Sequence, residues 1–205
     1  VNYTYDDRYI LTVNARGDAS SKFGSNHKWG FFPAVSVAWV VSKEKFMEKL
    51  PFIDNLKVRA GYGLAGNQNG IDSYTSLNLI RPNGVAPVGS SPVVTMDQLK
   101  NMNPDLKWEV KQTFNAGIEM ALLCNRLLLT ANYYNSKTKD MLYLYNVSVP
   151  PFTYNTLLAN IGSMRNYGTE LSIGVTPLKT KEMELNINAN LSFQQNKLLS
   201  LDGNY

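Results

Sequence analysis

The chain has 205 residues, of which 44% are hydrophobic, 18% charged and 11% aromatic, a balance that supports a folded domain and excludes an unstructured chain. The 20 Lys and Arg against 16 Asp and Glu give a net charge of only +4, and the basic residues are scattered, so we expect no nucleic-acid partner. The single cysteine, Cys124, excludes an internal disulfide, and the single histidine, His27, removes most histidine-dependent catalytic and metal sites.

Apolar and polar residues alternate along most of the chain. From the N-terminus, the alternating segments are residues 8–16, 31–41, 56–64, 108–122, 170–176 and 185–194. The last segment is the cleanest, with Leu185, Ile187, Ala189, Leu191 and Phe193 against Asn186, Asn188, Asn190, Ser192 and Gln194. A period of two is typical of a β-strand with one apolar and one polar face. The sequence therefore predicts an all-β, antiparallel fold.

The length of these segments favours a membrane β-barrel. A tilted strand needs about nine to eleven residues to cross a bilayer, whereas a strand of a globular protein usually has about five or six. No stretch of the sequence approaches the roughly 18 consecutive apolar residues of a transmembrane helix. A row of amides such as Asn186, Asn188 and Asn190 suits a hydrated lumen better than a packed core. We expect about eight long strands in a segment of a large outer-membrane barrel.

The connections between the strands are alternately short and long. Short ones lie at residues 6–7, 123–125 and 177–182, and long ones at residues 17–28, 65–105 and 135–166. This alternation is typical of short periplasmic turns and long extracellular loops. The link over residues 42–55 is longer than the other turns. Because Phe46, Met47 and Leu50 have helical spacing in it, we expect one short helix over residues 43–50 with Ser42 as its cap.

Aromatic residues gather near the predicted strand ends. They are Tyr3, Tyr5, Tyr9, Trp29, Trp39, Trp108, Tyr133 and Tyr134. Tyr and Trp are enriched where a membrane protein meets the lipid headgroups, so these residues are interpreted as an interfacial girdle.

Two other architectures remain open on the pattern alone. A soluble carbohydrate-binding β-sandwich would hold the polar face of each strand in water. A small complete barrel with a structural or adhesive role would close by pairing residues 1–5 with the strand that ends near Phe193.

No arrangement of residues indicates catalysis. Residues 61–66 match the dinucleotide fingerprint G-x-G-x-x-G, but a loop follows where the fingerprint requires a helix. His27 lies in a polar loop without a second metal ligand nearby, and Cys124 lies in a tight turn without a histidine to activate it. The loop carboxylates are too dispersed to form a pair: Asp72, Asp97, Asp105 and Asp140. We therefore expect no enzyme activity, no catalytic residue, no metal and no cofactor.

Ligand-contacting residues are not assigned by the sequence. The loop aromatics Phe152, Tyr154 and Tyr74 could stack on sugar rings, and they could equally pack the loops against one another.

Several short strings carry more information than the alternation. In chain order they are RGDASSKFG (16–24), WGFFPAVSVAW (29–39), NLKVRAGYG (55–63) with GNQ (66–68), LKWE (106–109), NRL (125–127), YYNSKTKD (133–140), and NIGSM (160–164) with GTEL (168–171). Each string is weak alone. Their order and their spread over nearly the whole chain resemble the barrel of SusC/RagA-type TonB-linked (TonB-dependent) outer-membrane receptors.

The resemblance implies a plugged barrel of about 22 strands, of which this segment would supply roughly a third. Residues 1–205 would then be a partial barrel domain, without the plug and the barrel termini. Such receptors lie in the outer membrane of Gram-negative bacteria and import glycans, oligosaccharides or peptides. They work with a SusD-like surface lipoprotein and take energy from TonB–ExbB–ExbD through the plug. Because its edges and apolar face would be uncovered, we expect the isolated segment to self-associate.

Overall fold

The computed structural model describes residues 1–24 and 26–201, and within them the chain forms two antiparallel sheets. The larger sheet has 8 strands in the order β1-β2-β3-β4-β7-β8-β9-β10, and β5 with β6 forms a separate hairpin. The strands are β1 (Asn2–Tyr5), β2 (Tyr9–Ala19), β3 (Trp29–Val40), β4 (Ile53–Asn67), β5 (Ile80–Val88), β6 (Ser91–Gln98), β7 (Glu109–Leu122), β8 (Leu127–Asn146), β9 (Thr156–Lys179) and β10 (Glu184–Ser200). The prediction of an all-β fold with about eight long strands is confirmed.

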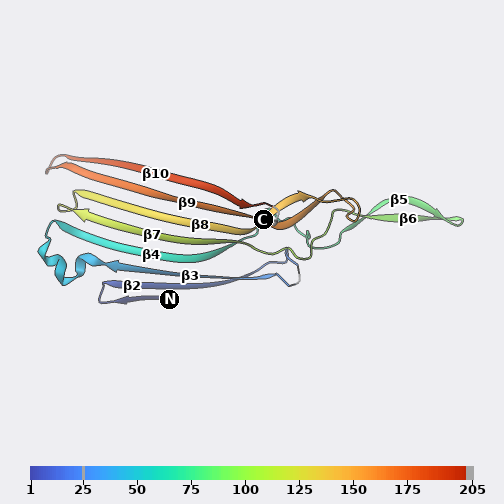
Figure 1. The fold of residues 1–205 in the computed structure, drawn as a ribbon, viewed down its shortest axis with the longest axis horizontal. Coiled ribbons are helices and arrows are strands. Elements are labelled where there is room, and N and C mark those ends of the chain that lie inside the picture. The colour runs from blue at the N-terminus through green and yellow to red at the C-terminus, as the bar shows by residue number, and fades with distance from the viewer. Residues whose placement is uncertain (25, 202–205) are drawn as a thin grey trace.

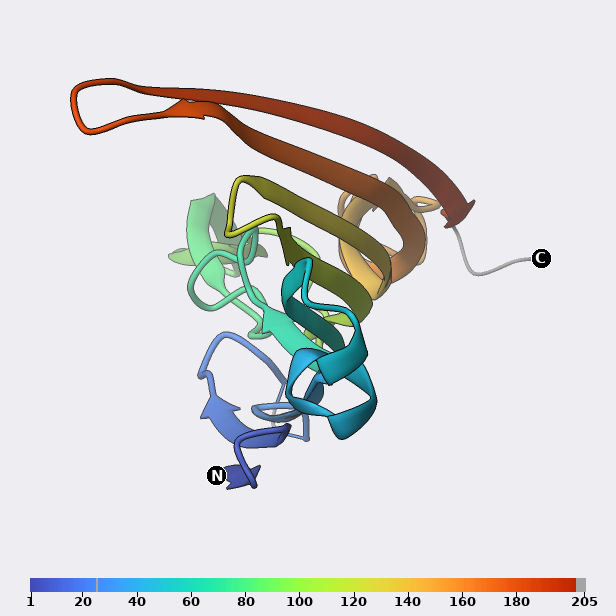
Figure 2. The ribbon, with the colours of Figure 1, turned by 90° about the vertical axis from the view of Figure 1, so that its left-hand side faces the viewer.

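The large sheet is a single layer (Figures 1 and 2). Each of its strands pairs with the next strand of the sheet along the chain, from β1 to β10. Among the described residues, β1 pairs only with β2, and β10 pairs only with β9. No second sheet covers either face of this part of the chain, so the β-sandwich alternative is wrong. The edge strands do not meet, so the small complete barrel, with residues 1–5 paired to the strand near Phe193, is wrong as well.

The strand register sorts the side chains into two faces. One row of paired residues crosses seven strands and is apolar throughout: Tyr9, Trp39, Val58, Ile118, Ala131, Leu171 and Leu191. The next row belongs to the opposite face and is mostly polar: Ala38, Arg59, Gly117, Asn132, Glu170 and Ser192. We call these the apolar face and the polar face. Their separation confirms the alternation seen in the sequence.

Short connections lie at one end of the sheet, which we call the turn end (left in Figure 1). The turns at Asp6–Asp7 and Leu123–Asn125 are built by residues with positive φ between 50° and 59°. The turn predicted over residues 177–182 is displaced, because β9 continues to Lys179 and the chain reverses between Thr180 and Met183.

The link between β3 and β4 also lies at the turn end, and it differs from the prediction of one helix. It contains two short 3-10 helices, η1 (Val41–Lys43) and η2 (Lys45–Lys49). Glu44 separates them in an extended conformation, with φ −81° and ψ 144°. Ser42 caps neither helix, and its hydroxyl instead donates to Oδ1 of Asn55 at 3.1 Å. In the described residues, no helix is long and apolar enough to cross a membrane.

The opposite end, which we call the loop end, is more ordered than predicted. Residues 135–166 are mostly strand, because β8 runs to Asn146 and β9 starts at Thr156. The segment predicted as a loop over residues 65–105 contains the end of β4 and the β5–β6 hairpin, which projects beyond the sheet (Figure 1). β9 has 24 residues, more than twice the roughly ten needed to cross a bilayer. β8, with 20 residues, and β9 are therefore both longer than a bilayer crossing requires.

A small core fills the loop end. It consists of Phe23, Phe32, Ile71, Leu106 and Trp108, from segments far apart in the sequence. Trp108 packs against Phe23 and Phe32, and its Nε1 donates to the carbonyl of Lys28 at 3.2 Å. Trp108 is therefore a core residue and not part of the interfacial girdle.

The girdle prediction is also wrong for Tyr134, which pairs with Gly168 and belongs to the polar face, like Asn132. Tyr133 belongs to the apolar face and pairs with Thr169 in the middle of β8 and β9. Tyr3, Tyr5, Tyr9 and Trp39 do lie near the turn end, and Trp29 begins β3 at the loop end.

Candidate functional site: the polar face and the loop end

Ion pairs and amides cover the middle of the polar face. The guanidinium Nε of Arg59 lies 3.0 Å from Glu119, and the Lys57 ammonium lies 3.9 Å from the same carboxylate. Arg59 also donates from Nη2 to Oδ1 of Asn132 at 2.7 Å. The Arg59 and Glu119 side chains are 43% and 37% exposed, so water reaches this network. Such hydrated pairs contribute little to stability, which suits a surface that lines an aqueous space.

Glycine makes room for these long side chains. A Cβ at Gly117 would lie 2.5 Å from Oδ1 of Asn132 and 3.1 Å from Nε of Arg59. A Cβ at Gly168 would lie 2.8 Å from the hydroxyl of Tyr134, the residue paired with it across the strands. The side chains on this face therefore lie over neighbouring strands instead of standing upright.

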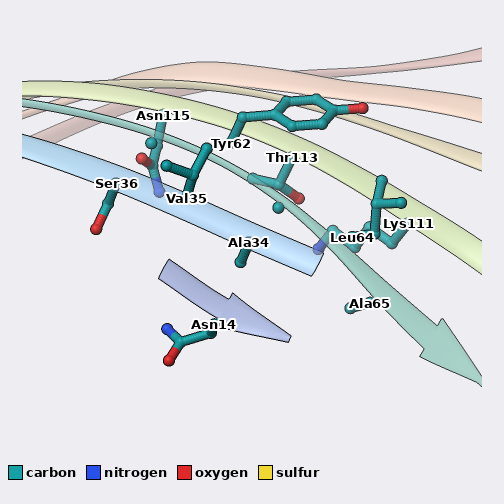
Figure 3. Close-up of a pocket in the computed structure, with 12 residues that line it drawn as sticks. Asn14, Ala34, Val35, Ser36, Tyr62, Leu64, Ala65, Lys111, Thr113 and Asn115 are labelled. Atoms are coloured by element: carbon teal, nitrogen blue, oxygen red, sulfur yellow. The ribbon is translucent and has the colours of Figure 1, made fainter. Parts of the chain in front are cut away.

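A shallow hollow of about 300 Å³ lies next to this network on β2, β3, β4 and β7. Small residues form its floor, among them Ala34, Gly61 and Gly63. Figure 3 shows Ser36 and Ala34 on one side of the strands, with Tyr62 and Val35 on the other. The polar groups around the floor are Asn14, Ser36, Lys111, Thr113 and Asn115. They provide amide, hydroxyl and ammonium groups that can form hydrogen bonds with a polar solute.

Asparagine side chains fasten the segment before β7 to β8 and β9 at the loop end. Asn101 donates to the carbonyls of Tyr154 and Thr156 at 2.6 and 2.8 Å and accepts from the amides of Thr153 and Tyr154. Asn160 exchanges hydrogen bonds with the backbone of Lys107 in the same way. The loops are thus held as one platform.

The loop aromatics have different surroundings in this platform. The Tyr154 hydroxyl donates to the carbonyl of Gln98, so this side chain packs one loop against another. Tyr74 is 62% exposed and lines a hollow of about 510 Å³ together with Lys22, Lys28 and Pro104. No described contact distinguishes a sugar-stacking role for Tyr74 or Phe152, and ligand-contacting residues stay unassigned.

None of the other candidate groups forms a catalytic centre. Cys124 is an exposed free thiol at the turn end, whereas His27 lies at the loop end, between β2 and β3. Within residues 1–24 and 26–201, no group of His, Cys, Asp or Glu side chains could hold a metal ion. Residues 61–66, which match the dinucleotide fingerprint, lie within β4 and are not followed by a helix.

Sequence reasoning did not find the Arg59–Glu119 pair or the asparagine contacts. Arg59 and Glu119 were recognised only as polar positions of separate strands, and their proximity depends on the pairing of β4 with β7. Asn101, Asn103 and Asn160 gave no signal, because an asparagine in a loop segment is ordinary.

Long antiparallel strands, an apolar face opposite a polar one, short turns and long loops at opposite ends define a segment of an outer-membrane β-barrel. The chain belongs to the TonB-dependent receptor family, since the family's sequence model described as TonB dependent receptor-like, beta-barrel, matches residues 1–205. The family consists of receptors, and this chain is accordingly part of a receptor and not an enzyme.

Individual relatives support the same assignment. The chain is 37% identical over 209 residues to TonB-dependent receptor P39 of Formosa agariphila, covering 98% of this chain and 19% of that protein. It is 32% identical over 206 residues to TonB-dependent receptor SusC of Bacteroides thetaiotaomicron, covering 99% and 20%. The chain thus spans about a fifth of the length of these relatives.

Solved structures of the RagAB peptide importer have the same fold. In the closed-closed state the TM-score is 0.84 at 27% identity, covering 98% of this chain and 22% of that chain. In the open-open state the TM-score is 0.87 at 27% identity, covering 98% and 21%. The similarity to SusC and to RagAB confirms the SusC/RagA-type resemblance.

Proposed function

We propose that residues 1–205 form part of the wall and the outer loops of a larger receptor that imports a nutrient across the outer membrane of a Gram-negative bacterium. The observation that carries this proposal is the division between an apolar face and a mostly polar face in the rows nearer the turn end. A row from Tyr9 to Leu191 is apolar on seven strands, and only lipid hydrocarbon is a suitable solvent for such a surface. The polar face then lines the lumen.

The proposed cargo is a glycan, an oligosaccharide or a peptide. The polar face supports this class, because Asn, Ser, Thr and Lys groups around the hollow can exchange hydrogen bonds with hydroxyl or amide groups of a passing molecule. The relatives named SusC and RagAB, the latter a peptide importer, support the same class. No single residue is proposed as the ligand contact.

The remaining parts of the machinery are proposed from the family. The other strands of the barrel and the plug would belong to the same receptor outside residues 1–205, and the plug would receive energy from TonB–ExbB–ExbD. A SusD-like lipoprotein would sit over the loop end, where the asparagine contacts hold the loops as a platform. Expressed alone, residues 1–205 would self-associate through the open edges of β1 and β10.

Thiol labelling of the intact receptor in living cells tests the orientation. Cys124 is exposed at the turn end, and Asn155 is exposed in the loop between β8 and β9. A membrane-impermeant maleimide should label Asn155→Cys, in a Cys124→Ser background, on intact cells. It should label Cys124 only after the outer membrane is opened. Equal labelling of both positions on intact cells would contradict the membrane-spanning arrangement.

A further inference from the structure

Basic residues of the apolar face lie side by side near the loop end. Lys137 of β8 pairs with Arg165 of β9, which pairs with Lys197 of β10. They alternate in register with Tyr133, Tyr167 and Phe193, so they belong to the face that meets lipid. Like charges directly opposite one another destabilise a sheet. Among the residues that the structure describes, no carboxylate lies within 4.0 Å of these cations.

The position of this basic row matches the level of lipid headgroups. The next row of paired residues on the same face, two residues nearer the turn end, contains Tyr62, Phe114, Asn135, Tyr167 and Gln195. Below that row the face becomes apolar, with Ala116 and Ile118 on β7. Two residues along a strand cover about 7 Å, so the cations lie just beyond an aromatic level. Aromatic residues mark the membrane interface, and the headgroups begin there.

The Arg165 guanidinium is held in place from two sides. Its Nε donates to Oδ1 of Asn135 at 2.9 Å, and its central carbon lies 5.2 Å from the centre of the Tyr167 ring. Tyr167 in turn donates from its hydroxyl to Gln195. In the described part of the chain, both Nη groups of Arg165 have no hydrogen-bond partner. A guanidinium fixed in this way offers a fork of donors, the geometry that binds phosphate oxygens.

A groove of about 300 Å³ connects the cations with the aromatic residues. It is lined by Tyr62, Gln112, Phe114, Asn135, Lys137, Arg165 and Leu199. One side of the groove is therefore aromatic and the other is cationic. This combination matches an amphiphile with a phosphate group attached to hydrocarbon chains.

We propose that Lys137, Arg165 and Lys197 bind a phosphate group of a lipid in the outer leaflet. A lipid is the occupant, and not a free phosphate ion, because Tyr62 and Phe114 continue the groove onto the apolar face along β4 and β7. The phosphate would neutralise the repulsion between the paired cations, and the acyl chains would lie over the apolar rows. This inference rests on the proposed insertion of the receptor in the outer membrane.

Native mass spectrometry of the intact, detergent-solubilised receptor tests the site. The probes are lipid A with its phosphates and the same lipid without them. Lys137→Gln, Arg165→Gln and Lys197→Gln should each weaken binding of the phosphorylated lipid by about tenfold, as expected for a lost charge-assisted hydrogen bond. Lys181→Gln removes the same charge from an exposed position at the turn end and should leave binding unchanged. The dephosphorylated lipid should bind to the unaltered receptor as weakly as the phosphorylated lipid binds to the triple variant.

Two results would overturn the inference. Unchanged lipid A binding by the triple variant would show that the basic row does not hold the phosphate. If inorganic phosphate, at the same concentration as lipid A, displaced the lipid completely, the occupant of the site would be a free phosphate ion. Labelling of Asn155→Cys on cells that express each variant separates these results from a failure of membrane insertion. If a variant is labelled normally and still binds phosphorylated lipid A, the proposed phosphate site is wrong and the proposed membrane insertion stands.

Discussion

The hydroxyl of Tyr9 donates a hydrogen bond of 2.7 Å to Oε1 of Glu44, which joins the start of β2 to the link between β3 and β4. The same oxygen accepts from Nε1 of Trp39 at 3.1 Å, and Arg8 lies 3.0 Å from the other oxygen. Tyr9 and Trp39 are paired across β2 and β3, and their rings stack with centres 6.3 Å apart. These contacts explain why Glu44 is extended between η1 and η2, where the sequence suggested a continuous helix.

The contacts of Glu44 predict an acid-sensitive element at the turn end. The hydrogen bond from Tyr9, and then that from Trp39, hold the pKa of Glu44 below its ordinary range. A carboxylate with a lowered pKa in the folded state contributes stability above the ordinary glutamate pKa, about 4.3. That contribution disappears as the pH falls through the lowered pKa. Glu44→Gln should therefore reduce the melting temperature of the intact receptor at pH 7. Between pH 5 and pH 3, which bracket the ordinary glutamate pKa of about 4.3, the melting temperature of the variant should fall less than that of the unaltered receptor.

Glu48→Gln is the matched control, because Glu48 is exposed in η2 and its side chain has no hydrogen-bond or ion-pair partner among the described residues. It should leave the melting curve as it is at each pH. Parallel curves for Glu44→Gln and the unaltered receptor over the whole range would show that the Glu44 contacts do not respond to acid.

Gly66 lies in a tightly packed part of the loop end, where a larger residue should destabilise the receptor. A Cβ at this position would overlap the ring of Phe32, which itself packs edge-on against Trp108. Gly66→Ala should displace the ring and destabilise the receptor by about 1–3 kcal/mol, the usual effect of overpacking. Thermal unfolding of the purified receptor measures the change.

Gly17 provides a control for the loss of a glycine in a strand. A Cβ at Gly17, in β2, would have nothing within 4 Å. Gly17→Ala should therefore leave the melting temperature unchanged or raise it slightly, since alanine reduces the freedom of the unfolded chain. If both alanine variants melt alike, Phe32 does not occupy the space beside Gly66.

The sequence predicted the strands best where the two faces of the sheet meet different solvents. In β10, Ile187 and Leu191 face one way and Asn188 and Asn190 the other, so the period of two is plain. In the loop-end half of β8, a polar stretch over residues 135–140 is followed by consecutive apolar residues from Met141 to Tyr145, so the alternation is lost although the strand continues. This is why residues 135–146 were predicted as part of a loop.

Long-range contacts account for the other differences. Trp108 resembles a girdle residue in the sequence, but its burial depends on Phe23 and Phe32, which are remote along the chain. The polar network likewise depends on the register of three strands, which brings Arg59 beside Glu119 and Asn132. Periodicity assigns a residue to a face without identifying its neighbours, so the character of the polar face was predictable and its contacts were not.

The hydrogen bonds of Asn101 should stabilise the loop between β8 and β9. It is 8% exposed and forms hydrogen bonds with the backbone of Thr153, Tyr154 and Thr156. Asn101→Ala should lose about 2 kcal/mol of local stability, because it leaves several backbone groups without partners. Hydrogen exchange of residues 147–156 should then be roughly thirtyfold faster. Asn83→Ala, which removes one 3.4 Å contact with Asp97 in an exposed hairpin, should leave this segment unchanged.

A substitution at Tyr154 can show whether this side chain packs the loops together or is free to stack on a sugar. Its hydroxyl donates to the carbonyl of Gln98, at the end of β6, and also approaches Asp97. Tyr154→Phe keeps the aromatic ring, which a stacked sugar would use, and removes only the hydroxyl.

If the side chain packs the loops, this change should weaken the anchoring of the β5–β6 hairpin by about 1 kcal/mol and speed hydrogen exchange of residues 91–99 about fivefold. Tyr143→Phe is the control, because the Tyr143 ring is exposed and its hydroxyl has no partner among the described residues. If residues 91–99 exchange hydrogen at the same rate in Tyr154→Phe and Tyr143→Phe, the Tyr154 hydroxyl does not anchor the hairpin. The Tyr154 ring would then be free to contact cargo, and the platform at the loop end would depend on the asparagine contacts alone.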